Sequence, residues 1–305
     1  MKILIVGGGS AGWMTAATLQ SQLPQHKIHL IESKNISTVG VGESTLGQIR
    51  SWMRLLKIND KDFIKHVDGS YKLSIKFTDF YKKGEAFHYP FGFPDMEGTQ
   101  NGINDWWFKK IFNPDTPNSD YAESMFPLQM AFVNNKKFNQ DINAYAYHFD
   151  ATKFGLWLKN NYCKKVKHIV DDIVSIEQDE NGIKSLNNTY KADLYIDCTG
   201  FKSLLLDKTL KEPFESYSDL LPNDSAWATK IPFKNKKKEL VPYTNCTAIQ
   251  NGWVWNIPLW SRIGTGYVYS SKFIDDDSAL KEFKKHLGKN DLEFKNIKMR
   301  TGIHN

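Results

Sequence analysis

Cysteine is scarce in this sequence, and the three present are Cys163, Cys198 and Cys246. They are odd in number, far apart, and without zinc-ligand spacing or partner histidines. Neither a disulfide framework nor a metal site is therefore indicated. Because reduced thiols are the rule inside cells, we expect a cytoplasmic protein without a metal.

Long hydrophobic runs are also missing. No apolar stretch approaches the roughly 20 residues that a membrane-spanning helix needs, and the first strand-like run leads into glycines instead of a signal-peptide cleavage site. Strong net charge is absent as well, because 40 basic residues oppose 34 acidic ones. The basic cluster 234–238 (KNKKK) is short and lacks aromatic residues, which is typical of a solvated loop. We expect no membrane and no nucleic-acid partner.

What is present is a large hydrophobic and aromatic fraction, 41% and 13% of the 305 residues. It allows one large α/β domain or two smaller ones. Residues 2–6 (KILIV) predict a strand buried on both faces, residues 13–20 a helix ending near Pro24, and residues 27–31 a second strand ending at Glu32.

The glycine-rich stretch GGGSAG (7–12) lies between that first strand and the helix. Glu32 follows about 20 residues later and can accept hydrogen bonds from ribose hydroxyls. A glycine-rich turn without a ligand is the simpler alternative. The acid and both strands favour a dinucleotide site.

Each residue of this stretch suits a dinucleotide. Gly7 permits the tight turn, Gly9 leaves room for a pyrophosphate, and Gly12 allows the helix to pack closely on the strand. Ser10 and Ala11 begin the helix, whose N-terminal amides and dipole attract an anion. NAD and FAD both remain possible at this point.

Two later stretches favour FAD. VGVGEST (39–45) places glycines around Glu43, so backbone can pass close to a flat flavin ring, although a plain loop would also use glycine. KADLYIDCTG (191–200) predicts a buried strand closed by Thr-Gly and resembles the strand near the end of the nucleotide-binding module in flavin monooxygenases.

In eight sequence blocks, which include the glycine-rich stretch and the two stretches above, the sequence resembles the flavin-dependent tryptophan halogenases and their relatives that act on other indoles or phenols. The resemblance implies an α/β fold: a Rossmann-like FAD/NAD(P)-binding fold with an additional mixed sheet that forms the flavin and substrate wall. The blocks follow the family's order: GGGSAGWM (7–14), VGVGEST (39–45), SYKLSIKF (70–77), YHFDA (147–151), DLYIDCTGF (193–201), NDSAWAT (223–229), WVWNIP (253–258) and GTGYVYSS (264–271).

The resemblance implies an enzyme that uses FADH2, oxygen and a halide ion to make hypohalous acid, which passes through a tunnel to a lysine. Lys72 matches that lysine and would deliver electrophilic halogen to a tryptophan-like or indole-like arene. Without the resemblance, a lysine in a half-polar strand is more often a solvated charge.

No second nucleotide site for NADH is visible, so we expect a separate flavin reductase as partner. Further FAD contacts are implied for Gly42, Glu43, Ser44, Ile75 and Ile173, the last on a strand near the adenine half.

Trp253 and Trp255 lie two apart on a predicted strand, so they point to one face, and Pro258 is expected to end that strand. Packing within a sheet accounts for most strand tryptophans. The resemblance implies a narrower role, in which the pair keeps organic substrate away from the flavin so that only halide is oxidised.

The aromatic-rich stretch at about 81–143 is the expected substrate-facing insert. Phe87, His88 and Phe91 lie where tryptophan-specific members place aromatic and histidine residues around indole, although each is equally compatible with loop core. In YHFDA, we expect Asp150 to cap the following helix, and His148 to position the FAD-contacting segment rather than to catalyse.

The match stops before the family's C-terminal part, which carries a halide-binding loop, a glutamate that partners the lysine, and helices over the substrate. We therefore expect one incomplete module over 1–305, with FAD-binding parts at about 1–80 and 144–209, the insert at about 81–143 and the mixed sheet at about 210–305. A homo-oligomer or a complementing C-terminal chain would cover the surface left open. Two alternatives remain: a catalytically idle FAD-binding fragment or subunit of a split halogenase, and a flavin monooxygenase.

Overall fold

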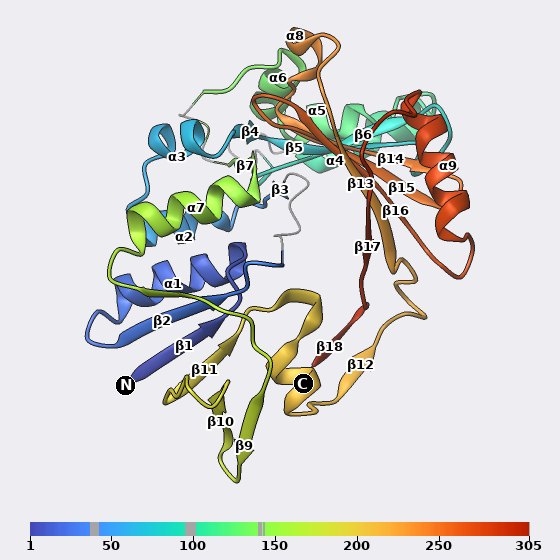
Figure 1. Ribbon diagram of the computed structural model, residues 1–305. Coiled ribbons are helices and arrows are strands. Elements are labelled where there is room, and N and C mark those ends of the chain that lie inside the picture. The colour runs from blue at the N-terminus through green and yellow to red at the C-terminus, as the bar shows by residue number, and fades with distance from the viewer. Residues whose placement is uncertain (37–42, 95–101, 140–141, 143, 305) are drawn as a thin grey trace.

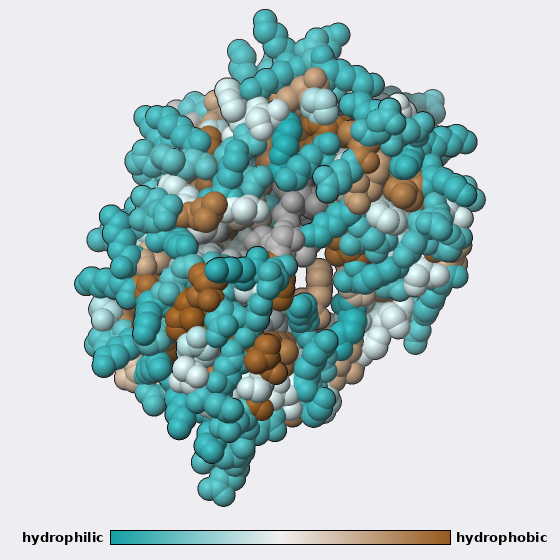
Figure 2. Space-filling view, viewed as in Figure 1, coloured by the Kyte–Doolittle hydropathy of each residue, from teal (hydrophilic) through white to brown (hydrophobic). Residues whose placement is uncertain are grey.

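The computed structural model describes residues 1–36, 43–94, 102–139, 142 and 144–304, with the backbone alone at 102–105. Figure 1 shows two sheets side by side, one built around the N-terminus and a larger one beside α9. Hydrophilic side chains cover most of the face seen in Figure 2, and hydrophobic ones gather in separate clusters. Within the described ranges no helix is long and apolar enough to span a membrane.

The N-terminal sheet is parallel, with the strand order β11-β1-β2-β8. β1 lies between β2 and β11, with Val6 opposite both Ile31 and Asp197. Both strands predicted near the N-terminus are confirmed. The strand predicted within 191–200 is also present, but it lies at the edge of the sheet and none of its residues is buried, contrary to our expectation. The strands are β1 (Lys2–Val6), β2 (Lys27–Glu32), β8 (Lys167–Val170) and β11 (Leu194–Asp197).

Both faces of the central strand β1 are covered, which explains why this strand is almost continuously hydrophobic. Successive residues of a strand point to opposite faces. Ile5 and Leu30 belong to the cluster that includes α1 (Ser10–Gln22) and α7 (Ala151–Tyr162). Leu4 and Val6 pack on the other face, against β10 (Gly182–Leu186), which pairs with β9 (Ile176–Asp179), and against the π-helical turn η2 (Leu204–Thr209).

Ile173 does not lie on a strand, contrary to our expectation. β8 ends at Val170 and β9 begins at Ile176, so Ile173 belongs to the connection between them. Its side chain packs against the hydrophobic cluster on the β10 face of the parallel sheet. The two consecutive aspartates before it, Asp171 and Asp172, interrupt the apolar pattern that suggested a continuous strand.

A three-stranded antiparallel sheet, order β3-β7-β4, lies between the two larger sheets (Figure 1). Ser44 and Ser70, on its two outer strands, are both opposite His148 on the central one. The sheet thereby joins three segments that are far apart in the sequence. Its strands are β3 (Glu43–Ser44), β4 (Ser70–Lys72) and β7 (Ala146–Phe149).

The largest sheet has seven strands in the order β17-β13-β16-β15-β14-β5-β6, and it is mixed because β14 and β5 run parallel. One face is covered by α9 (Asp276–Leu287), which packs on Val254, Tyr267 and Tyr269. The expected mixed sheet at about 210–305 therefore begins earlier in the chain than we expected. Its strands are β5 (Ser74–Thr78), β6 (Ala86–Pro90), β13 (Ser225–Ile231), β14 (Tyr243–Ile249), β15 (Gly252–Pro258), β16 (Ile263–Tyr269) and β17 (Lys295–Lys298).

The insert at about 81–143 is partly helical rather than only loops, since it contains α4, α5 and α6 after β6. A last two-stranded sheet pairs β12 with β18 and links the end of the described chain to residues that follow η2. The remaining elements are α2 (Ile49–Leu55), α3 (Asp60–His66), α4 (Gly102–Phe112), α5 (Asp120–Met125), α6 (Pro127–Asn134), η1 (Gly200–Lys202), β12 (Phe214–Ser216), α8 (Lys236–Glu239) and β18 (Gly302–His304).

Candidate active site

The turn after β1 is closed by backbone contacts that exclude a side chain. Gly7 has a φ of +113°, and a Cβ there would lie 2.2 Å from the carbonyl oxygen of Cys198. A Cβ on Gly12 would lie 1.9 Å from the carbonyl oxygen of Gly7, whereas one on Gly9 would meet nothing within 4 Å. The turn is tight at Gly7 and Gly12 and open at Gly9, which is what the phosphates of a dinucleotide need.

The helix that follows offers donors at this opening. α1 begins at Ser10, its N-cap is Gly9, and its first turn contains no acidic residue. The first amides of a helix have no intrahelical acceptor, and the helix dipole adds positive potential there. Ser10, Ala11 and Gly12 therefore fit a pyrophosphate beside Gly9.

Glu32 ends β2 directly beside the turn. Its Oε1 lies 2.6 Å from Nε2 of His168 on β8, and a Cβ on Gly8 would lie 1.6 Å from its Oε2. The carboxylate is thus held by His168 and lies against the glycine turn, where an acid can reach a ribose. Sequence reasoning missed His168, because it lies 136 residues from Glu32 and belongs to no motif.

Glu43 ties its segment to the start of α7; Gly42 before it lies outside the described residues. Oε2 of Glu43 accepts a hydrogen bond from the amide of Ala151 at 2.9 Å. Burial raises the pKa of Glu43 to about 7, and the Ala151 hydrogen bond opposes this shift. Asp150 caps the same helix by accepting from the amide of Lys153 at 3.0 Å, which confirms the predicted cap.

Trp253 and Trp255 lie on β15, which ends at Pro258 as predicted, and their ring centroids are 6.1 Å apart. Alternation along the strand places both on one face of the large sheet. A Cβ on Gly266 of β16 would lie 2.2 Å from the ring of Trp255, so this indole lies across the neighbouring strand. Its Nε1 is buried without a hydrogen-bond partner among the residues described.

Ile75 shares the face of Trp255. The register sets Ile75 opposite Thr244, and Cys246 opposite Trp255. Thr244 and Cys246 are two apart on β14, so all four side chains point to the same side. This face therefore brings together a predicted flavin contact and the predicted barrier.

Lys72 ends β4 and is only 2% exposed. Its Nζ donates to the carbonyl oxygen of Thr45 at 2.9 Å and lies 5.0 Å from the centroid of the Phe91 ring. Burial lowers the pKa of Lys72 to about 8, and nearby Cys246 opposes the shift. The side chain is thus an enclosed amine whose neutral form is accessible in mildly alkaline solution. The Thr45 contact could not be predicted, because it involves a backbone carbonyl.

The three proposed substrate residues do not lie together in the structure. Phe91 lies beside Lys72, as described. Phe87 is opposite Phe77 and stacks on it, with ring centroids 5.2 Å apart, on the Ile75 face. His88 points to the other face, where its Nδ1 lies 2.9 Å from Oγ of Ser74. Burial, followed by nearby Lys76, lowers the pKa of His88 to about 4. Phe87 and His88 therefore cannot enclose one ring together.

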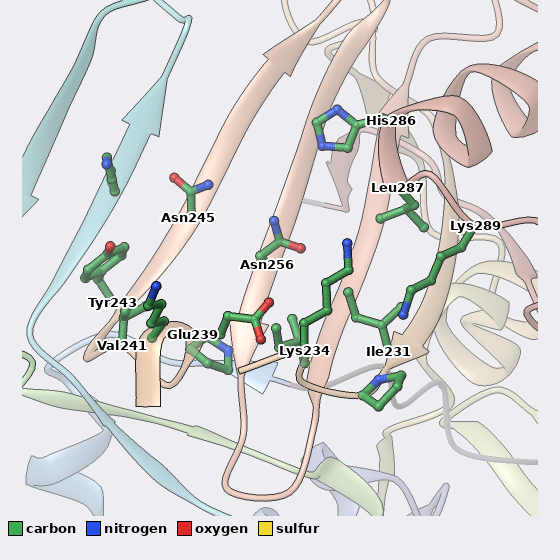
Figure 3. Close-up of a pocket in the computed structure, with 15 residues that line it drawn as sticks. Ile231, Lys234, Glu239, Val241, Tyr243, Asn245, Asn256, His286, Leu287 and Lys289 are labelled. Carbon is green, nitrogen blue, oxygen red and sulfur yellow. The ribbon is translucent and has the colours of Figure 1, made fainter. Parts of the chain in front are cut away.

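Figure 3 shows a cavity of about 370 Å³, which is lined among others by Asn256 of β15. Because Asn256 and Trp255 are consecutive on this strand, the cavity lies on the face of the large sheet away from Trp255. Asn245 and Asn256 form its base on β14 and β15, and Glu239 is its acidic residue. The basic cluster contributes to the rim and includes the short helix α8 rather than loop alone. Of the predicted site residues that the structure describes, only Pro258 borders this cavity. Its lysines are Lys76, Lys234, Lys238 and Lys289.

The open glycine turn, the helix N-terminus and Glu32 beside the parallel sheet are the features of a Rossmann-like α/β fold. The chain belongs to the tryptophan halogenase family, because the model of that family matches residues 2–305.

Relatives and solved structures agree with this assignment. The tryptophan 6-halogenase SttH of Streptomyces toxytricini is 32% identical to this chain over an alignment of 346 residues, gaps included. The alignment covers 99% of this chain and 64% of SttH. The structure titled VirX1 apo is 42% identical with a TM-score of 0.92, covering 99% of this chain and 62% of the other. Xcc4156, a flavin-dependent halogenase from Xanthomonas campestris, is 30% identical with a TM-score of 0.89, covering 99% and 62%. The chain thus spans less than two thirds of the length of each.

Proposed function

We propose that this chain catalyses the FADH2-dependent halogenation of an electron-rich aromatic compound, such as tryptophan or another indole. The names of SttH and Xcc4156 support this activity class. The observation that carries the proposal is the enclosed amine of Lys72, with its pKa lowered to about 8.

Bound FADH2 would supply electrons that activate oxygen, and the activated oxygen would be the oxidant that converts a halide ion into hypohalous acid. The opening at Gly9 and the first amides of α1 would hold its phosphates, and Glu32 its ribose. A separate flavin reductase would provide the reduced cofactor. Further contacts are proposed for Gly42, Glu43, Ser44, Ile75 and Ile173.

Lys72 would handle the hypohalous acid in either protonation state. As an ammonium it donates a hydrogen bond to the acid; as a neutral amine it exchanges one N–H for an N–halogen bond, and water leaves. A pKa of about 8 makes both forms available near neutral pH. Trp253 and Trp255, with Pro258 at the strand end, would keep the arene away from the flavin. Phe91 is the best placed of the proposed substrate contacts.

The decisive experiment supplies the chain with FAD, a flavin reductase, NADH, oxygen and bromide, together with a panel of indoles and phenols. Mass spectrometry should detect a brominated product with the wild-type chain and none with Lys72→Met, while FAD binding is unchanged. Lys76→Met is the matched control, because Lys76 borders the cavity on the other face. Normal bromination by Lys72→Met would exclude the proposed role.

The same assay separates the alternatives. A monooxygenase would yield a hydroxylated product without any halide. An idle fragment or one half of a split enzyme would bind FAD and form no product alone; adding a complementing C-terminal chain would restore bromination only in the second case. The proposed module division, with a substrate-facing insert at about 81–143, predicts that insert variants change arene preference without changing FAD affinity.

A further inference from the structure

His148 lies at the centre of the three-stranded sheet and is 0% exposed. Its Nδ1 is 3.1 Å from Oγ of Ser70, and its Nε2 is 2.9 Å from Oγ1 of Thr244. Thr244 Oγ1 lies 2.5 Å from Oγ of Ser44. These four side chains form one continuous chain of hydrogen bonds that links β3, β4, β7 and β14.

The carbonyl oxygen of Pro258 sets the direction of this chain. A carbonyl can only accept, so Ser70 donates its single proton to it at 2.6 Å. Because Ser70 has no second proton to give, its oxygen must accept from His148. The ring proton of His148 therefore lies on Nδ1.

The other half of the chain follows from a neutral ring. Burial, and after it nearby Lys72, lowers the pKa of His148 well below its usual value, although the Pro258 carbonyl opposes the shift. A neutral imidazole has one N–H. Nε2 must then accept from Thr244, and Thr244, whose proton is used, must accept from Ser44. The Ser44 proton thus points to Thr244 and is not available to a ligand.

We infer that His148 is a positioning residue: as the neutral Nδ1–H tautomer it orders three hydroxyl groups, so that Ser44 presents only an acceptor to the flavin. The last step rests on the proposed FAD site. The flavin ring system carries both N–H donors and carbonyl acceptors, and an acceptor-only Ser44 selects a ring N–H as its partner. The same chain of hydrogen bonds connects the Glu43–Ser44 segment to Pro258 at the end of β15, the strand of Trp253 and Trp255.

The tautomer can be tested without any assay of activity. Long-range ¹H–¹⁵N spectra of histidine-labelled protein show which ring nitrogen bears the proton, and the signals absent from His148→Gln identify the residue. We expect the Nδ1–H pattern, unchanged between pH 6 and 9. An Nε2–H pattern, or a charged ring at neutral pH, would overturn the inference. A wild-type chain that fails to bind FAD would overturn the proposed function and leave this measurement standing.

The role of Ser44 is tested by FAD titration. Thr244→Val should raise the FAD dissociation constant about fivefold, because Ser44 is then no longer held as an acceptor and its hydrogen bond to the flavin is worth roughly this factor. Thr244→Ser should restore the wild-type dissociation constant. Ser44→Ala should weaken FAD by a similar factor, and combining it with Thr244→Val should add little further loss. Thr247→Val, on the opposite face of β14, is the matched control and should not affect FAD. Equal FAD affinity in Thr244→Val and wild type would contradict the inference, as would full additivity.

Discussion

The candidate site has two ends, the glycine turn with Glu32 and the surroundings of Lys72. The first end is formed mainly by backbone atoms and the second mainly by side chains. The first uses backbone: the turn at 7–12 packs on itself and on the backbone of Cys198, directly after β11, and β2 supplies Glu32. The second uses side chains from two sheets, and its members, such as Ser44, Lys72 and Thr244, are far apart in the sequence. A turn whose shape depends on steric exclusion can therefore be predicted from a short sequence motif. An enclosed amine cannot, because its burial depends on the pairing of strands that are far apart in the sequence.

The largest expected effect tests whether the dinucleotide end depends on backbone packing. Gly12→Ala should lower the free energy of unfolding by about 4 kcal/mol, since the new Cβ meets backbone rather than a movable side chain. Gly9→Ala should leave stability unchanged and weaken FAD binding, because the space it enters is open. Urea unfolding and FAD titration measure the two quantities. Equal stability losses in both variants would show that the turn is not open at Gly9.

At the other end, Lys72→Met should stabilise the fold at pH 7 by up to about 3 kcal/mol, the equivalent of lowering the lysine pKa from 10.5 to about 8. Below pH 8 the folded protein must bury the charged amine. Between pH 8 and 10.5 it has released this proton while the unfolded chain still holds it, so wild-type stability rises with pH. The variant should lack that rise in urea unfolding at a series of pH values. Parallel curves would refute the enclosed-amine description.

A smaller effect is expected for the tryptophan face. Gly266→Ala should cost about 2 kcal/mol, because its Cβ displaces the ring of Trp255 rather than backbone alone. Near-ultraviolet circular dichroism should change along with thermal stability. Gly47→Ala, at a position with nothing within 4 Å, should change neither. A silent Gly266→Ala would mean that Trp255 does not lie across β16.

The smallest effect concerns an ion pair between the start of α7 and the connection from β15 to β16. Arg262, after β15, pairs with Oδ2 of Asp150 at 2.8 Å, and both side chains are largely shielded from solvent. Asp150→Asn keeps an oxygen to cap α7 but removes the charge, so we expect a loss of about 1 kcal/mol. Asp150→Ala should lose about 1 kcal/mol more, because the cap is also removed. Differential scanning calorimetry resolves the two steps. Identical losses in the two variants would mean that the side-chain cap contributes nothing, and an Asp150→Asn variant as stable as wild type would mean that the charge contributes nothing.

Sequence reasoning reached different depths in the two regions. The strands at 2–6 and 27–32, the glycine turn and the Asp150 cap were predictable because each depends on neighbours within a few residues. Ile173 was placed wrongly on a strand, since an apolar pattern does not show where strand pairing ends. Phe87 and His88 were grouped by proximity in sequence, although alternation along β6 sends them to opposite faces.

By itself, the sequence determined the parallel nucleotide-binding unit, the family and the residue types of the site. Only the tertiary structure decided that Lys72 is enclosed, that Thr45 accepts its hydrogen bond, that His168 holds Glu32, and that His148 has its proton on Nδ1. The reason is physical: backbone conformation and periodicity act locally, whereas burial, pKa shifts and the direction of hydrogen bonds depend on which distant strands become neighbours.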